Sequence, residues 1–141
     1  MTTTGRLVAV ALLAMAAAGC GRARVRECKA LVEKINAGDE AVTRAGGAGD
    51  PAGQLRTLAT AVDTARADVL ALQLDDTKLA SLRAEYATML RSVAGVARKV
   101  AVDATSKDND ALAADSQQLQ SAIAKEAGIV HAVNAYCRRP R

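Results

Sequence analysis

The sequence predicts an all-α protein, an antiparallel up-down four-helix bundle with coiled-coil-like seams. Half of its 141 residues are hydrophobic, many of them alanine, with two Tyr and neither Phe nor Trp. Alanine is the best helix former and a poor strand former. The larger apolar residues recur at alternating steps of three and four, which is the period of one helical face. Both observations favour helices and exclude a sheet.

Polar clusters at 46–51, 74–77 and 105–110 divide the chain into four predicted helices. In the first cluster Asp50 precedes Pro51, an N-cap acid followed by a proline suited to the first helical position. A helix is therefore expected to begin at about Pro51. The other clusters supply caps for two more helices, and Pro140 closes the last.

Heptad seams are expected on the helices. The second helix carries Leu55, Leu58, Val62, Ala65, Val69 and Leu72. The third carries Leu79, Leu82, Tyr86, Met89, Val93, Val96 and Val100. The first helix carries Val25, Cys28, Val32, Ile35, Asp39 and Val42, and its apolar pattern weakens after Gly38. The last helix carries Leu112, Ser116, Leu119, Ile123, Glu126, Val130, Val133 and Cys137. Ala127 is expected to cover part of the gap that the polar Glu126 leaves in this stripe. Such stripes joined by short loops are typical of a bundle; three helices, one of them long and bent, are the alternative.

The first twenty residues form a second pattern. A positive start is followed by an apolar run of about twelve residues, Leu7–Ala18, too short to span a membrane and suited to a signal peptide. It ends in Ala17-Ala18-Gly19-Cys20. This ending resembles the lipobox of bacterial lipoproteins, although Ala17 stands where the family usually has Leu. The resemblance implies that the Cys20 thiol carries diacylglycerol, that the chain is cut before it, and that the new amino terminus is acylated.

From this resemblance follows a division of the chain. Residues 1–19 are the expected signal peptide, 20–26 a lipid-anchored basic tether, 27–138 the helical bundle and 139–141 a basic tail. Gly21 is not the aspartate associated with retention in the inner membrane, so the periplasmic face of the outer membrane is expected in a Gram-negative cell. Ordinary signal cleavage that leaves Cys20 unmodified, an uncleaved anchor, and a cytoplasmic protein with an apolar start are the alternatives.

Three cysteines occur, Cys20, Cys28 and Cys137. If lipid consumes Cys20, two remain in an oxidising compartment, which predicts a Cys28–Cys137 disulfide. A bond closing a loop of roughly a hundred residues contributes up to about 4.7 kcal/mol. The alternative is two free buried thiols that pack as small hydrophobes.

Positive charge gathers near the two ends of the mature chain. Residues 27–137 hold 12 Lys and Arg against 15 Asp and Glu, a net charge of −3. In an up-down bundle both ends meet at the lipidated side, so the flanking arginines would form a collar that binds lipid phosphates, each contributing about 1 kcal/mol near an anionic surface. The alternative, given equal weight, is that these terminal arginines only make the protein more soluble. The expected collar consists of Arg22, Arg24, Arg26, Arg138, Arg139 and Arg141.

No pattern of catalytic, metal-binding or cofactor-binding residues occurs. His131 is the single histidine and is expected to be a half-buried packing residue. The glycine-rich stretch 46–49 lacks the lysine and strand of a phosphate loop and is a linker. The acid pairs at 75–76 and 108–110 lie where helix caps are needed. No basic helical stripe interleaved with aromatics suggests nucleic acid. The sequence therefore indicates neither an enzyme nor a cofactor.

Two classes of function remain. The first is a structural or protein-interaction module of the cell envelope, anchored in the membrane through Cys20 and bound to another envelope protein. The alternative is a non-catalytic module that binds a lipid or other apolar ligand. A contiguous exposed apolar surface favours the first, whereas an enclosed apolar cavity of about 300 Å³ or more favours the second.

Overall fold

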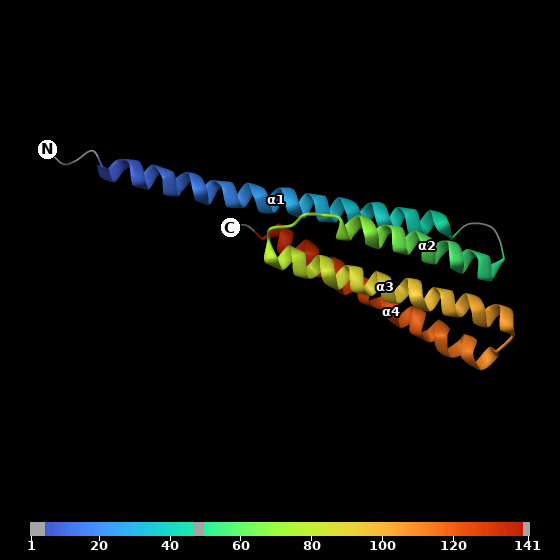
Figure 1. Cartoon of the computed structure of the whole chain (residues 1–141). Coiled ribbons are helices and arrows are strands. Elements are labelled where there is room, and N and C mark those ends of the chain that lie inside the picture. The colour runs from blue at the N-terminus through green and yellow to red at the C-terminus, as the bar shows by residue number, and fades with distance from the viewer. Residues whose placement is uncertain (1–4, 47–49, 140–141) are drawn as a thin grey trace.

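The computed structural model describes residues 5–46 and 50–139, and their side chains from Gly21 onward. This part of the chain folds into four helices and contains no strand. The prediction of an all-α four-helix bundle is thereby confirmed at that level (Figure 1). The helices are α1 (Gly5–Ala45), α2 (Pro51–Leu70), α3 (Thr77–Ser106) and α4 (Asn109–Arg138).

An aspartate caps the start of each of the last three helices. The carboxylates of Asp50, Asp76 and Asp108 accept backbone N–H groups of the following turn at 2.7 to 3.0 Å. Each acceptor satisfies donors that have no partner inside the helix. The three helix starts predicted from the polar clusters are confirmed, and so is the capping role of Asp76 and Asp108.

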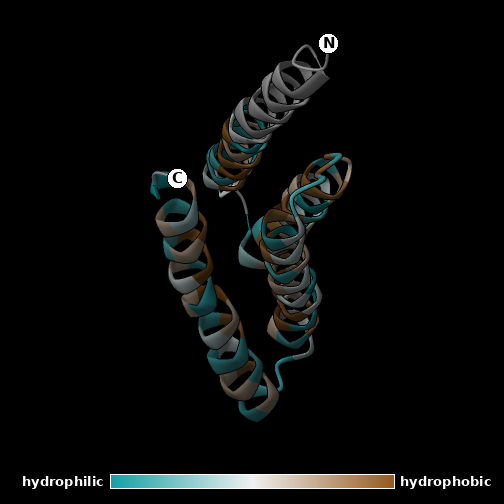
Figure 2. Cartoon of the chain, turned by 90° about the vertical axis from the view of Figure 1, so that its left-hand side faces the viewer, coloured by the Kyte–Doolittle hydropathy of each residue, from teal (hydrophilic) through white to brown (hydrophobic). Residues whose placement is uncertain are grey.

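Neighbouring helices along the chain are also the main packing partners. α1 packs chiefly on α2, α2 on α3, and α3 on α4, whereas α1 makes few contacts with α3 and α4. Figure 2 shows the consequence, because α4 diverges from α1 when the bundle is seen from the end near the C-terminus. The side of the bundle between α1 and α4 is therefore its least tightly packed side.

The core follows the predicted seams of the middle helices. On α2, Val62, Ala65 and Val69 are buried, and on α3 every predicted seam residue except the half-buried Val96 is buried. Alanines fill much of the remaining space, and this allows the helices to approach closely. Tyr86 is the largest fully buried side chain.

The predicted seam of α4 is confirmed in part. Val133 is buried, and Leu119, Val130 and Cys137 pack against the core. Ile123 lines the interior cavity but is 45% exposed, and Ala127 is exposed and does not cover Glu126. Ala122 and Ile129, which the seam did not include, are also buried, because α4 packs mainly on α3.

The two ends of the bundle differ. The segment 71–76 that joins α2 to α3 lies beside the end of α4, and the connections between α1 and α2 and between α3 and α4 lie at the opposite end (Figure 1). We call the first the disulfide end, because Cys28 and Cys137 are bonded there, and the second the distal end.

Candidate functional site

The disulfide end is closed by the predicted Cys28–Cys137 bond, which joins α1 to α4. The two Cα atoms are 5.7 Å apart and the residues are 109 positions apart in the sequence. Such a separation is ordinary for a disulfide. Cys28 is buried, so the bond lies within the core rather than on the surface.

A hydrogen-bonded network covers this end. The Tyr136 hydroxyl donates to the Asp76 carboxylate at 2.8 Å, and the Asp76 backbone N–H donates to the Glu27 carboxylate at 3.0 Å. Glu27 is only 6% exposed. One carboxylate from α1 and one phenol from α4 therefore hold the start of α3 in place, which fixes three helices relative to one another.

Arg24 completes the network from α1. Its guanidinium lies 5.5 Å from the centre of the Tyr136 ring and donates to the backbone carbonyl of Arg139 at 2.6 Å. Burial would raise the pKa of Asp76, but hydrogen bonds from Leu79, Tyr136 and Lys78 and the charge of Arg24 together lower it. The hydrogen bond to Asp76 and burial raise the pKa of Tyr136. Asp76 is thus held ionised and Tyr136 protonated.

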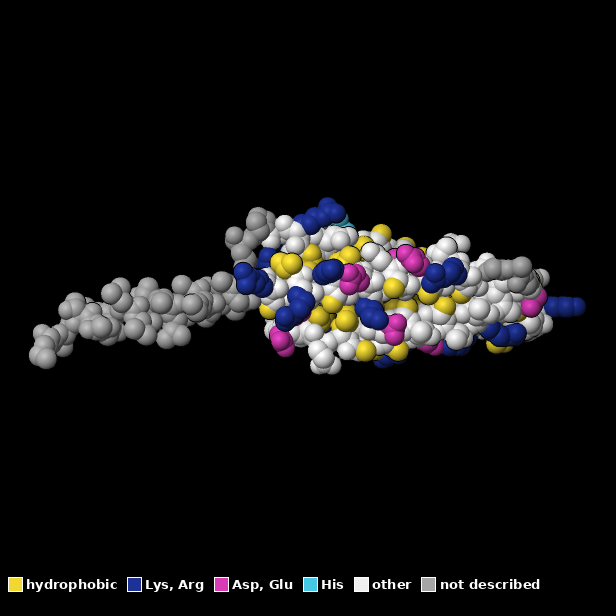
Figure 3. Space-filling model, turned by 90° about the horizontal axis from the view of Figure 1, so that it is seen from above, with side chains coloured by type: hydrophobic (Ala, Val, Ile, Leu, Met, Phe, Trp, Pro, Cys, Tyr) yellow, Lys and Arg dark blue, Asp and Glu magenta, His cyan; other side chains and the backbone are white. Residues whose placement is uncertain are grey.

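The predicted arginine collar divides into two parts. Arg24 is half-buried in the network, whereas Arg22, Arg26, Arg138 and Arg139 are exposed. The contact between Arg24 and Arg139 shows that the arginines of both chain ends do come together at the disulfide end. Figure 3 shows dark-blue Lys and Arg side chains at the left-hand end of the described bundle and a mixture of both signs elsewhere. Arg141 lies outside the described residues.

Exposed apolar side chains accompany the arginines. Val25, on α1 between Arg24 and Arg26, is 65% exposed, and Leu70 at the end of α2 is 40% exposed. Cys20 and the expected signal peptide lie outside the residues whose side chains the structure describes. In the described part of the chain, no helix combines the length and the apolarity needed to cross a membrane.

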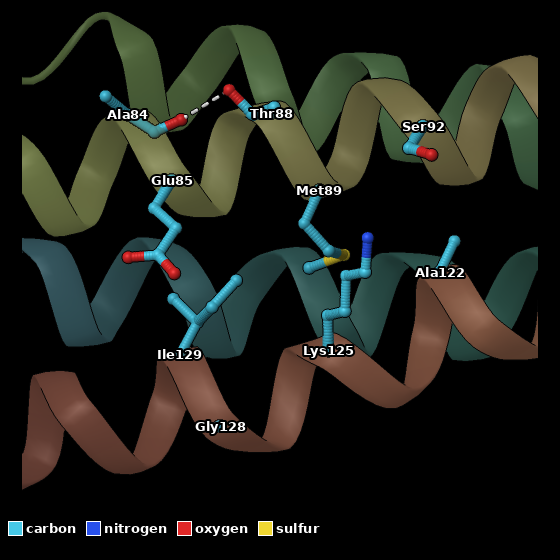
Figure 4. A pocket seen from close by; sticks show the side chains of 9 residues that line it. All are labelled: Ala84, Glu85, Thr88, Met89, Ser92, Ala122, Lys125, Gly128 and Ile129. Carbon is cyan, nitrogen blue, oxygen red and sulfur yellow. Dashed lines mark hydrogen bonds between the residues drawn. The ribbon is translucent and has the colours of Figure 1, made fainter.

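A groove on the outer face follows the seam between α3 and α4. Its volume is about 730 Å³, and it is open to solvent along its length. Met89 and Glu85 point from α3 toward α4, whereas Ile129 and Lys125 point from α4 toward α3 (Figure 4). The other lining residues are small: Ala84, Thr88, Ser92, Ala122 and Gly128.

This groove continues toward the distal end as a shallower and more polar depression. Ser92, Ala122 and Lys125 line both parts, and Gln117 and Gln118 belong to the second. The whole surface is therefore one track along α3 and α4, apolar nearer the disulfide end and polar nearer the distal end. The sequence did not predict this track, because Ala122 and Ile129, which line it, lie outside the predicted α4 stripe.

The bundle interior holds a much smaller cavity, of about 110 Å³. All four helices line it, mostly with apolar side chains, and Asp39, Tyr86 and Glu126 supply its polar groups. The Tyr86 hydroxyl is 3.3 Å from Asp39 and 3.1 Å from Glu126. The two acids that interrupt the predicted seams of α1 and α4 thus meet a single buried phenol.

The single histidine does not belong to a site. His131 is exposed, so the expected half-buried packing role is wrong; it lies on the solvent side of α4, outside the packed positions Val130 and Val133. Among the described residues no three His, Cys, Asp or Glu side chains are arranged to hold a metal ion. Neither a known protein family, nor a curated protein, nor a solved structure matches this chain.

Proposed function

We propose that this chain is a small bacterial lipoprotein, anchored in the membrane through an acylated Cys20, that acts as a non-catalytic protein-interaction module of the cell envelope. Its helices form an antiparallel up-down bundle with coiled-coil-like seams, the disulfide end faces the membrane, and the α3–α4 groove receives a partner. The observation that carries the partner role is the open groove of about 730 Å³ on the outer face.

The chemistry of the disulfide end supports the orientation. The exposed arginines Arg22, Arg26, Arg138 and Arg139 surround the point where α1 leads back toward Cys20. Basic side chains bind anionic lipid headgroups, and the exposed Val25 supplies an apolar contact beside them. An anchor at Cys20 would hold this end of the bundle near the periplasmic face of the outer membrane.

The groove is suited to a helix of an envelope protein. Small side chains let a partner backbone approach closely, and the buried Met89 and Ile129 form an apolar floor beneath them. Glu85 on one wall and Lys125 on the other select a helix that carries a base and an acid at matching positions. The alternative function, binding of a lipid or other apolar ligand, has less support, because the interior cavity of about 110 Å³ is far below the roughly 300–1,000 Å³ of ordinary ligand pockets.

The test is site-specific photocrosslinking in cells of the source organism. A photoreactive residue at Ser92, in the groove, is expected to crosslink to one envelope protein, and the same residue at Thr60 on α2 is not. Gly128→Arg should abolish the crosslink, because an added Cβ at Gly128 meets no atom within 4 Å and the long side chain can lie in the groove without disturbing the fold.

Gly95→Arg is the matched control, since Gly95 is equally unobstructed on α3 but does not line the groove. This variant should crosslink like the wild type. Equal crosslinking from Thr60, indifference to Gly128→Arg, or an adduct of twice the mass of this chain would overturn the envelope-partner proposal.

A further inference from the structure

Asp39, Tyr86 and Glu126 make a polar contact across the open side of the bundle. Tyr86 is 1% exposed, and its hydroxyl lies within 3.3 Å of a carboxylate from α1 and 3.1 Å of one from α4. A phenol has one proton to donate. It can therefore satisfy only one of the two carboxyl groups at a time.

Both carboxyl groups lie within hydrogen-bond distance of the same phenol oxygen, so they also lie near each other, and a proton on one of them would supply the donor that the phenol cannot give twice. Asp39 is exposed and Glu126 is half-buried, so burial favours the protonated form at Glu126. Burial, then the nearby charge of Asp39, raises the pKa of Glu126, and the Tyr86 hydrogen bond opposes this in part.

Among the described residues, no ion pair joins a lysine or arginine to Asp39 or Glu126. The titratable groups that face the cavity are Asp39 from α1, Tyr86 from α3 and Glu126 from α4. Its lining from α2 is apolar: Leu58, Val62 and Ala65. A second pair of neighbouring carboxyl groups, Asp103 and Asp115, differs in this respect, because the Lys99 ammonium lies 3.5 Å from Asp115.

The disulfide sets the register of this contact. Asp39 follows Cys28 by eleven residues, and Glu126 precedes Cys137 by eleven residues. Eleven residues make about three helical turns, or roughly 16 Å. Both acids therefore lie at the same height above the bond and on the same face as the bonded cysteine. Elsewhere α1 and α4 touch little.

We propose that Asp39, Tyr86 and Glu126 form an acid-closed latch: a proton shared between the two carboxyl groups holds α4 against α1, and its loss lets the distal half of α4 move away. The disulfide is the hinge of this movement, since it keeps α1 and α4 together at one end. Opening exposes the apolar lining of the interior cavity and shifts α4, which forms one wall of the groove.

The sign of the pH dependence follows from the position of the proton. Because the folded-state pKa of Glu126 is raised, its stabilising effect is complete below the ordinary glutamate value near 4.5 and is lost as pH rises through the folded-state value. The latch is thus closed in acid and opens toward neutral or alkaline pH. Tyr86 stays protonated throughout, because burial and the two nearby carboxylates raise its pKa.

Hydrogen–deuterium exchange of the full, disulfide-bonded chain in detergent tests the latch. After correction for the intrinsic effect of pH on exchange, peptides spanning 119–130 should exchange faster at about pH 8 than at about pH 5, the direction expected for a carboxyl group whose pKa is raised in the folded state. Peptides of α2 provide the internal reference and should show no such difference.

Glu126→Gln should abolish the pH difference, since an amide still hydrogen-bonds to Asp39 and Tyr86 but does not titrate. Asp39→Asn, which changes the acid on α1 instead of the acid on α4, should also abolish the pH difference. The test therefore stays decisive if one of the two variants folds poorly. Glu40→Gln, an exposed acid beside Asp39 on α1 that does not line the cavity, should retain the wild-type difference. Exchange of 119–130 that is independent of pH in the wild type, or that keeps its pH dependence in both latch variants, would overturn the proposal.

Discussion

Asp76 links the stability of the disulfide end to pH in the opposite sense to Glu126. Its side chain caps α3 through the N–H groups of Lys78 and Leu79 and also accepts the Tyr136 hydroxyl. All of these donors favour the ionised form, and despite burial the pKa of Asp76 lies below its ordinary value of 3.8. The stabilisation is present above that value and is lost as pH falls through the folded-state pKa.

We predict that Asp76→Asn lowers the free energy of unfolding at pH 7 by about 0.5–1 kcal/mol, because asparagine keeps the cap but loses the charge at the helix N-terminus. This cost should shrink and disappear as the pH falls through the lowered folded-state pKa of Asp76. Urea denaturation between about pH 2.5 and 7 measures it. Asp75→Asn, at an exposed neighbouring position, should cost little at any pH; an equal, pH-independent loss in both variants would contradict the assigned role of Asp76.

The latch residues illustrate what the sequence could and could not reveal at this scale. Asp39 and Glu126 were recognisable as breaks in apolar stripes, and Tyr86 as a seam residue. That one phenol serves both acids depends on three helices meeting at one height, and no local pattern contains that information. Helix caps, in contrast, are local, and Asp50, Asp76 and Asp108 were predictable because each cap acts on the turn that follows it.

At the scale of the helices, close approach between α1 and α2 depends on a glycine. A Cβ added at Gly38 would lie 3.0 Å from the Cβ of Ala65, an atom held rigidly by the backbone of α2. The exposed ion pair between Lys34 and Asp68 also joins these helices, but such pairs contribute at most about 1 kcal/mol. Packing at Gly38, and not charge, therefore sets the spacing of α1 and α2.

Substitution of two glycines separates this packing effect from helix propensity. Gly38→Val should lower the free energy of unfolding by about 1–3 kcal/mol, since overpacking forces the helices apart. Gly95→Ala should raise it by up to about 1 kcal/mol, because its Cβ meets nothing within 4 Å and alanine favours the helix. Thermal or urea denaturation checks both; a stabilising Gly38→Val would show that α1 does not lie closely on α2.

The faces of the helices were predictable where a helix has neighbours on two sides. α3 lies between α2 and α4, and its heptad stripe is buried nearly as predicted. α4 has one main neighbour, and Ala122 and Ile129 are buried against it in addition to the predicted stripe. These two residues line the groove, and because they lie outside the predicted stripe, the sequence did not predict it.

At the scale of the whole molecule, the disulfide and the arginine-rich surface lie at the same end of the bundle. The disulfide, the buried network around Asp76 and the exposed arginines all lie at one end, whereas the polar part of the groove lies toward the other. The bond removes about 2–5 kcal/mol of loop entropy from the unfolded chain, a large share of the stability of a small domain. The pairing was predictable from the sequence, because Cys20, if it is acylated as proposed, leaves only Cys28 and Cys137 to form a disulfide.

The proposed membrane orientation, the disulfide hinge and the envelope role all depend on the fate of the three cysteines. The intact mass of the protein purified from its native membrane fraction, before and after reduction and alkylation, measures that fate directly. We predict the mass of residues 20–141 plus acyl chains, with two alkylatable thiols that appear only after reduction. An unlipidated mass, or thiols that are free without reduction, would contradict the anchored lipoprotein.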